Sequence, residues 1–305
     1  MLRPAAALPA MHAPSTRKDT KPPSLPDPRR RALLGQAAGL ALAAPLTAPL
    51  AGCASSAPSS RSAAINSQHR AQGQDSRALF LVLHFTSEPF EASLRILTRQ
   101  AVSAHYLLSD EAPPVVYQLV PEQQRAWHAG DSAWGGHSQL NASSIGVEIV
   151  NPGALTLASG ERVFAPYPAA QIDRLIPLLQ DIVQRHQIRP DRVLGHSDIA
   201  PQRKLDPGPA FPWQRLAAAG LLRWPDPAQV AALLPGYAAA PPSAAWLQQA
   251  LARIGYSVPA SGLLDPATQR VVAAFQMKYR PARFDGQPDA QTAALLHSLA
   301  DPLVP

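Results

Sequence analysis

The sequence predicts an α/β domain with a central, mostly buried mixed sheet flanked by helices, followed by a small C-terminal domain of three helices. Apolar runs of strand length lie at 78–85, 115–120, 145–150 and 192–194. Helical spacing of apolar residues separates them at 91–102 and 170–187. Because strand and helix patterns alternate, we expect one sheet with helices on its faces. Pro177 falls inside the second helical pattern and predicts a kink or a late start. Further helical patterns lie at 245–254, 266–279 and 289–299.

The first strand, A-L-F-L-V-L-H-F at 78–85, is apolar along almost its whole length. This pattern is typical of a central strand that is covered on both faces. His84 lies at its far end. On the strand pattern alone, this histidine is either a hydrogen-bonded core residue or a metal ligand.

The strand at 145–150 carries an acidic residue between apolar neighbours. Ile145, Val147 and Ile149 form one face, and Glu148 points to the other. A buried carboxylate is costly unless it is paired or used in chemistry. A structural salt bridge and a catalytic role therefore both remain open for Glu148.

The stretch G-H-S-D-I-A-P-Q-R-K-L-D-P-G-P-A-F-P-W at 195–213 holds an imidazole (His196), an ammonium (Lys204) and a carboxylate (Asp206). Its prolines and glycine disfavour a regular helix, so we expect a shaped loop that turns these side chains toward a common point. A catalytic zinc site usually takes three protein ligands and leaves one position for water. The loop offers two, so the third has to come from elsewhere in the chain.

A chain of 305 residues is long enough for one full-sized domain and a smaller companion. The formal net charge is +6, but residues 1–52 alone hold seven Lys and Arg against two Asp and Glu. The rest of the chain is therefore close to neutral, and we expect no nucleic-acid partner. We expect the protein to be a monomer.

Residues 1–52 are predicted to be an export signal. Three arginines at 29–31 precede a mildly apolar run that contains no acidic residue, a layout that favours the twin-arginine route. The run ends in L-A-G-C, which resembles the lipobox of bacterial lipoproteins, so Cys53 is predicted to carry the lipid anchor. Residues 53–76 would then form a tether, and the protein would be a periplasmic lipoprotein, anchored to the outer membrane. A cytoplasmic chain with an uncut leader is the alternative.

The segment from His196 to Asp206 resembles the zinc loop of the family 2 N-acetylmuramoyl-L-alanine amidases, which are related to T7 lysozyme and peptidoglycan recognition proteins. Four other motifs occur in the family's order: L-V-L-H-F-T at 81–86, V-S-A-H-Y at 102–106, W-H-A-G at 127–130 and S-I-G-V-E-I-V-N at 144–151. The resemblance extends over roughly residues 75–220, and we assign the catalytic domain to 77–220.

The resemblance implies a single zinc ion held by His84, His196 and Asp206, with water in the fourth position. Glu148 would then be the general base and later the acid, and Lys204 would stabilise the oxyanion. The implied reaction is hydrolysis of the amide bond between the lactyl group of N-acetylmuramic acid and L-alanine, in peptidoglycan or its fragments. Family-like contexts also imply substrate contacts or supporting roles for His105, Tyr106, Trp127, His128 and Asn151.

The C-terminal part begins after a proline-rich stretch at 221–243, which is predicted to be a linker. Asp265 and Pro266 provide a cap and a first turn for the second of its three helices. The pieces L-Q-Q-A-L at 247–251 and F-Q at 275–276 resemble the three-helix peptidoglycan-binding module of wall hydrolases, which we assign to 244–302. A helical bundle for dimerisation is the alternative.

Three other functions compete with an exported amidase. A non-catalytic peptidoglycan-binding lipoprotein is disfavoured because the chain retains all five residues that the resemblance assigns to the chemistry. A cytoplasmic recycling amidase is disfavoured by the export leader and the wall-binding module. A zinc endopeptidase that cuts within the stem peptide would be distinguished by the masses of its products.

Overall fold

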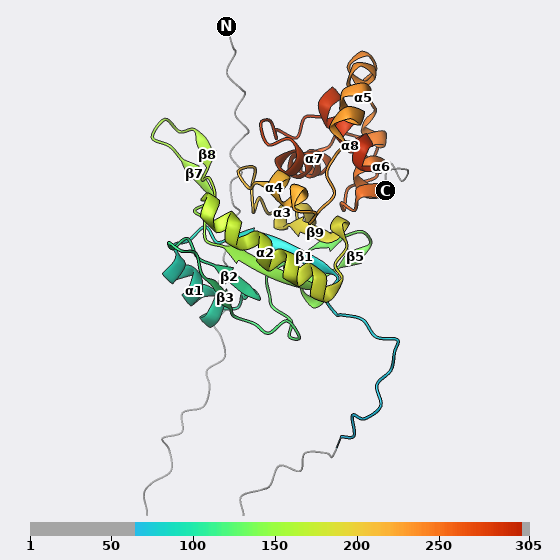
Figure 1. Ribbon diagram of the computed structural model, residues 1–305. Helices are drawn as coiled ribbons and strands as arrows, with labels where there is room; N and C mark the ends of the chain where they lie inside the picture. Colours follow the sequence, from blue (N-terminus) through green and yellow to red (C-terminus); the bar gives the residue numbers. More distant parts are fainter. Residues whose placement is uncertain (1–64, 301–305) are drawn as a thin grey trace, which may run out of the picture. The chain divides into compact units, whose positions relative to one another are not determined.

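The computed structural model describes residues 65–300, in which all helices and strands belong to one compact unit that begins at Gly73 (Figure 1). The predicted signal at 1–52, Cys53 and the first part of the predicted tether lie outside the described residues. Within residues 65–300, none of the helices has the length and apolarity that crossing a membrane requires.

Five strands form the central sheet, in the order β3-β2-β6-β1-β9. Four of them run parallel: β1 (Phe80–Phe85), β2 (Tyr106–Leu108), β6 (Ser144–Ile149) and β9 (Val193–Gly195). The edge strand β3 (Val116–Gln118) is antiparallel to β2. The predicted mixed, mostly buried sheet is thus confirmed. The sequence pattern does not predict β2, because three residues are too few to show a period.

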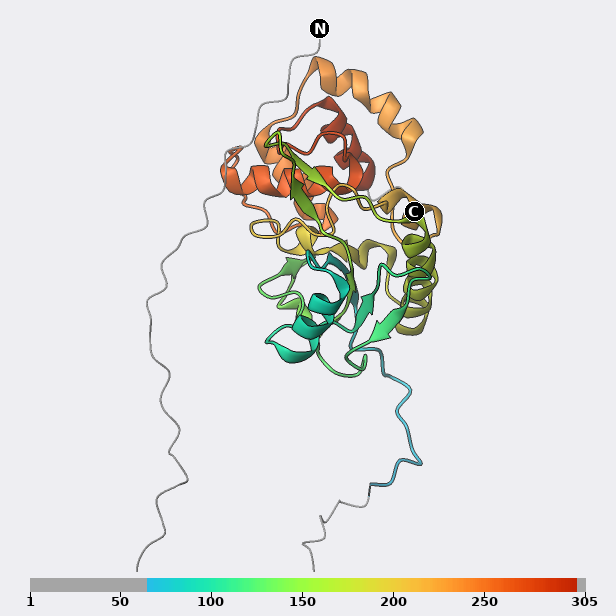
Figure 2. The same ribbon diagram turned by 90° about the vertical axis from the view of Figure 1, so that its left-hand side faces the viewer.

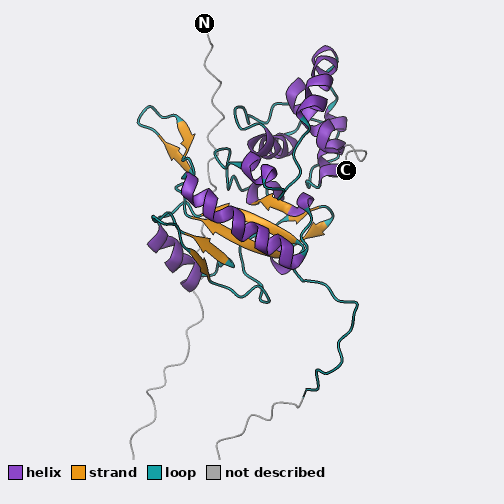
Figure 3. Cartoon of the chain, in the orientation of Figure 1, coloured by secondary structure: helices purple, strands orange, loops and turns teal. Residues whose placement is uncertain are grey.

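Helix α2 (Ala169–His186) covers one face of the sheet (Figures 1 and 3). Its Ile172 and Leu175 pack in one core cluster with Leu81 of β1 and Val147 of β6. The apolar face predicted for β6 therefore faces this helix. The helix begins at Ala169 and runs through Pro177, so the late start is wrong. Pro177 is tolerated because it lies on the exposed side, where water can bind the carbonyl group left without a backbone donor.

The C-terminal helices lie beyond β9, at one edge of the sheet (Figure 3). They are α6 (Ala244–Ile254), α7 (Pro266–Tyr279) and α8 (Ala290–Ala300), close to the predicted bounds. Phe80 and Val82 of β1 share a core cluster with Leu251, Phe275 and Leu296 of these helices. The helical domain therefore shares a core cluster with the face of β1 that points away from α2.

The predicted linker at 221–243 contains a helix, α5 (Pro227–Ala239), which the local sequence pattern does not predict. Asp226 caps it by accepting a hydrogen bond from the backbone of Ala228, and Pro227 occupies the first turn. The helix packs along α8, where Tyr237 Oη lies 2.7 Å from His297 Nδ1.

The remaining elements are short or peripheral. Helix α3 is a single turn that ends just before Pro201, so the predicted loop at 195–213 begins with a helical turn. The hairpin β7–β8 extends from the sheet toward the C-terminal helices, and the ring centroids of Phe164 and Phe284 lie 6.0 Å apart (Figure 2). The bounds are α1 (Phe90–Arg99), α3 (His196–Ile199), α4 (Trp213–Ala218), β4 (Ala133–Trp134), β5 (His137–Ser138), β7 (Ala154–Thr156), β8 (Arg162–Phe164), and the 3₁₀ turns η1 (Leu140–Ala142) and η2 (Pro190–Arg192).

Candidate metal centre and active site

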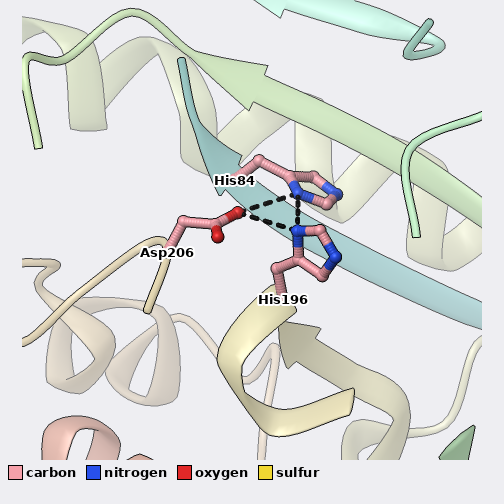
Figure 4. A group of neighbouring side chains, drawn as sticks. All are labelled: His84, His196 and Asp206. Carbon is pink, nitrogen blue, oxygen red and sulfur yellow. Dashed lines mark hydrogen bonds and ion pairs between the residues drawn. The ribbon is translucent and has the colours of Figure 1, made fainter. Parts of the chain in front are cut away.

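Two imidazoles and a carboxylate converge at the carboxyl edge of the parallel strands (Figure 4). His84 is the second-last residue of β1, and His196 begins α3 immediately after the neighbouring strand β9. Asp206 lies in the loop that follows α3. Its backbone carbonyl oxygen accepts a hydrogen bond from Ser197 N at 2.8 Å, which holds this part of the loop beside His196. The three residues predicted as ligands therefore lie together, although they are up to 122 positions apart in the sequence.

The three facing atoms form a nearly equilateral triangle. His84 Nδ1 and His196 Nδ1 are 3.0 Å apart, and each is 3.0 Å from Asp206 Oδ2. All three residues are buried, with exposed fractions of 1%, 3% and 6%. A tetrahedral zinc ion with bonds of about 2.0 Å holds its ligand atoms about 3.3 Å apart, which is close to the sides of this triangle.

Hydrogen bonds on the outer side of His84 fix which of its nitrogens carries the proton. The Ser144 hydroxyl donates to the carbonyl of Leu140 at 2.6 Å, so it accepts from His128 Nε2 at 3.1 Å. His128 Nδ1 then accepts from His84 Nε2 at 3.0 Å. His84 Nδ1 is therefore left as a lone pair that faces the centre.

A single direct contact assigns the same tautomer to His196. Its Nε2 lies 3.2 Å from the carbonyl oxygen of Ala129, which can only accept, and 3.4 Å from the guanidinium of Arg203, which can only donate. The shorter contact assigns the proton to Nε2, so Nδ1 presents its lone pair. Burial, with His196 acting in the same direction, lowers the pKa of His84 to about 4. Burial alone would raise the pKa of Asp206, but the two histidines hold it below its usual range. Two neutral imidazoles and one carboxylate suit a divalent zinc ion.

Glu148 lies beside the triangle. It is paired in register with His84 on the neighbouring strand β6, so both side chains leave the sheet on the same face. Its Oε2 is buried without a hydrogen-bond partner among the described residues. Burial raises the pKa of Glu148 well above its usual value, with Asp206 adding to the shift and Lys204 opposing it. The structural salt bridge that the strand pattern left open is therefore not formed.

A pocket of about 250 Å³ opens onto these groups. It is lined by the three converging residues and by Glu148 and Lys204, and its outer wall includes Trp127, which is 50% exposed. His128 also lines it while supporting His84. Of the predicted substrate contacts, Trp127 and His128 thus lie at the pocket.

The other three residues predicted near substrate lie in the framework. His105 is fully buried, accepts a hydrogen bond from Gly146 N and contacts Arg77. Tyr106 donates to Glu122 at 2.7 Å on the far side of the sheet. Asn151 holds the chain at Gly153 and Pro166. None of the three lines the pocket, so their contacts with substrate are not supported.

Several supporting residues carry no clear signal in the sequence. Ser144 ends the hydrogen-bonded chain from His84, and Arg203 donates to the same Ala129 carbonyl that His196 uses. Gly146 is the exception, because an added Cβ would lie 2.4 Å from the His128 ring. A glycine inside a buried strand is the pattern that could have pointed to this close approach.

Two imidazoles, a carboxylate and a glutamate that line one pocket at a sheet edge are the kind of residue set that metal-dependent hydrolases use. The N-acetylmuramoyl-L-alanine amidase family matches residues 74–209, and the putative peptidoglycan-binding domain matches residues 241–296. The amidase AmiD of Escherichia coli K12 is 45% identical over 244 residues, which are 78% of this chain and 87% of AmiD. The chain belongs to the N-acetylmuramoyl-L-alanine amidase family.

Solved structures agree. The complex of E. coli AmiD with anhydro-N-acetylmuramic acid-L-Ala-D-gamma-Glu-L-Lys has a TM-score of 0.69 at 43% identity and covers 77% of this chain and 93% of that one. AmpDh3 of Pseudomonas aeruginosa with anhydromuramic pentapeptide has a TM-score of 0.71 at 39% identity and covers 78% and 97%. The chain is thus an amidase that acts on peptidoglycan or its fragments, and the non-catalytic alternative is rejected.

Proposed function

We propose that the chain uses one zinc ion, held by His84, His196 and Asp206, to hydrolyse the bond between the lactyl group of N-acetylmuramic acid and L-alanine. The observation that carries the metal assignment is the convergence of three lone pairs within 3.0 Å of one another. Such an arrangement is repulsive unless a cation lies between the three atoms.

The metal ion, Glu148 and Lys204 have separate roles in the proposed reaction. A zinc ion at this site would polarise the scissile carbonyl and lower the pKa of a bound water toward about 7. Glu148 takes a proton from the attacking water and returns it to the departing amine of L-alanine. Lys204 lines the same pocket, and its ammonium would stabilise the negative charge that the carbonyl oxygen gains.

Substrate enters along the wall that carries Trp127. An indole that is half exposed beside a catalytic pocket offers a flat apolar surface to the sugar ring or to the first residues of the stem. The two relatives crystallised with anhydromuramic peptides support muropeptides as the substrate class. Because the site is complete within one chain, we propose that the enzyme is a monomer.

We also propose the domain limits and the location. The catalytic domain is 77–220 and the wall-binding module is 244–302. An amidase of peptidoglycan acts where the wall lies, and the lipobox-like L-A-G-C supports acylation of Cys53 and anchoring to the outer membrane on the periplasmic side. Labelled palmitate should be incorporated into the intact chain and not into Cys53→Ala; equal labelling of both would refute the anchor.

The test of the reaction is digestion of purified wall material and of soluble muropeptides by the purified protein. We expect free stem peptides that begin with L-alanine, no products after chelation of the metal, and recovery on addition of zinc. Fragments cut within the stem would instead indicate an endopeptidase, and full activity of protein shown to be free of metal would refute the zinc site.

A further inference from the structure

The turn that carries His196 is held by side chains from the C-terminal helical module. Lys278 of α7 is 4% exposed, and its Nζ donates to Asp198 Oδ2 at 2.8 Å and to the carbonyl of Val193 at 3.1 Å. The same ammonium lies 4.4 Å from the centroid of the Trp213 ring. Lys278 thus reaches from the module to the first residue of β9 and to the single turn of α3.

Asp198 connects this contact to the metal centre. It is 1% exposed, and its Oδ2 also accepts the backbone N–H of Gly195 at 2.8 Å. Its other oxygen accepts the hydroxyl of Tyr256 at 2.6 Å, and this tyrosine also belongs to the helical module. The carboxylate therefore closes the turn from Gly195 to Asp198, and His196 is the first helical residue inside that turn.

The charge balance makes the contact important. A carboxylate removed from water is stable only when a cation and hydrogen-bond donors compensate it. Among the described residues, Lys278 is the cation that forms an ion pair with Asp198. The amidase domain thus supplies the acid that shapes the turn, and the helical module supplies its counter-ion.

Helix α7 also contacts the other part of the loop. Gln202 donates to the carbonyl of Ala267 at 3.0 Å and accepts from Arg270 Nε at 2.7 Å. Ile199 of α3 lies in the same core cluster as Phe275 of α7. The helix therefore touches the loop both next to His196 and on the way to Asp206.

We propose that Lys278 and Tyr256 are positioning residues for the metal site, so that the wall-binding module completes the framework that aims His196. This inference rests on the zinc site proposed above. It assigns the module a second role besides retention on the wall, because a loosened module would weaken the metal site directly.

The test uses the full chain with Lys278→Met and Tyr256→Phe, and Ser298→Ala as the matched control. Ser298 is buried in the same module and accepts a hydrogen bond from Asp226 N at 3.0 Å, so its partner lies at the start of α5 and not in α3. Zinc affinity is measured by competition with a chromogenic chelator, and the ligand geometry by the absorption bands of the cobalt-substituted protein.

We expect Lys278→Met to weaken zinc binding by about tenfold or more and to change the cobalt spectrum, as loss of an outer support does in other metal sites. Tyr256→Phe should give a smaller loss in the same direction, and Ser298→Ala should match the parent. If Lys278→Met does not fold, because Asp198 is left buried without its cation, Tyr256→Phe decides the question.

Parent-like zinc affinity and cobalt spectra in the folded variants would overturn the positioning role, even if their melting temperatures fell, because the contact would then only stabilise the fold. If the parent itself bound no zinc, the proposed metal site would fail. One equivalent of zinc in the parent, held equally well by the variants, would refute the positioning role alone.

Discussion

Two buried acidic clusters lie in the same domain, and both contain histidine. In the first, Glu122 is 5% exposed and its oxygens take hydrogen bonds from Arg185, Tyr106 and, at 2.9 Å, His186 Nε2. In the second, Asp206 faces the lone pairs of two imidazoles. The first cluster has a permanent cation in its arginine, whereas the second brings acceptors together beside Glu148, whose Oε2 has no partner in the part of the chain that the structure describes.

This difference in charge balance distinguishes a cluster that stabilises the fold from one that is suited to metal binding and catalysis. Satisfied hydrogen bonds and a paired charge lower the free energy of the fold, so the Glu122 cluster needs nothing further. In the second cluster, hydrogen-bond acceptors that face one another, together with the Glu148 carboxylate, raise the free energy of the folded state unless a cation and a substrate bind there. The carboxylate and imidazole groups alone do not distinguish the clusters, because both clusters contain them.

Removal of a ligand gives the largest contrast between the clusters. Asp206→Ala should lose its zinc and fall to background amidase activity, because two neutral imidazoles alone hold the ion weakly. His186→Ala, in the other cluster, should keep one zinc per chain and most of its activity. Metal analysis and product release measure both, and a full complement of zinc in Asp206→Ala would contradict the ligand set.

Removal of the Glu148 carboxylate should have the second-largest effect. Glu148→Gln should lower kcat about 10²- to 10⁴-fold, the range of general acid–base catalysis, while zinc content stays that of the parent. Its thermal stability should not fall, because the exchange removes a charge whose buried Oε2 has no hydrogen-bond partner among the described residues. Undiminished turnover in this variant would clear Glu148 of the proposed role.

The charge at Lys204 should have a smaller effect. Lys204→Ala should reduce kcat by about 10²-fold with little change in zinc content, the size expected for loss of one group that stabilises an oxyanion. Lys204→Arg keeps the positive charge and should recover part of the rate. If the alanine variant instead lost its metal, Lys204 would be assigned to the support of the loop.

Local periodicity predicts much of the fold. The run at 78–85 is found as β1 because a buried parallel strand has an almost continuous apolar sequence, and the apolar positions at 145, 147 and 149 are found on one face of β6. Alternation along β6 also placed Glu148 opposite the apolar face. By contrast, β2 and α5 depend on partners distant in the sequence, and neither a three-residue strand nor a proline-led helix shows a decisive local pattern.

In the site, too, some residues could be predicted from the sequence and others could not. The ligand set followed from a loop motif together with a family resemblance, and the side chains do meet. The residues that support the ligands could not be predicted from the sequence, because Ser144 and Asp198 are ordinary polar residues in it. Their importance arises from hydrogen-bond direction and from charge balance across the fold, and Lys278 meets Asp198 from 80 residues away.

In the satisfied cluster the expected change is in stability. Glu122→Gln removes a charge that Arg185 and His186 share, and should lower the free energy of unfolding by about 1–3 kcal/mol, since Arg185 is 40% exposed and can return to water. Amidase activity per folded molecule should stay at the parent level. Glu161→Gln, at an exposed position, is the control and should change neither quantity.

The pH dependence of stability gives the smallest effect and the most specific one. Burial alone would raise the pKa of Glu122, but hydrogen bonds from Arg185, His186 and Tyr106 lower it to about 2, from 4.5 for the free group. A depressed pKa in the folded state contributes stability above the unfolded value, and this contribution is lost as pH falls from about 4.5 toward 2.

Melting temperatures of the parent between pH 6 and pH 2 should therefore fall more steeply than those of Glu122→Gln, and the two curves should approach each other at the acid end. Because the amide in this variant cannot ionise, parallel curves over this range would show that Glu122 binds its proton equally in the folded and unfolded states. The arginine would then not compensate the acid, and the contrast with the metal centre would lose its electrostatic basis.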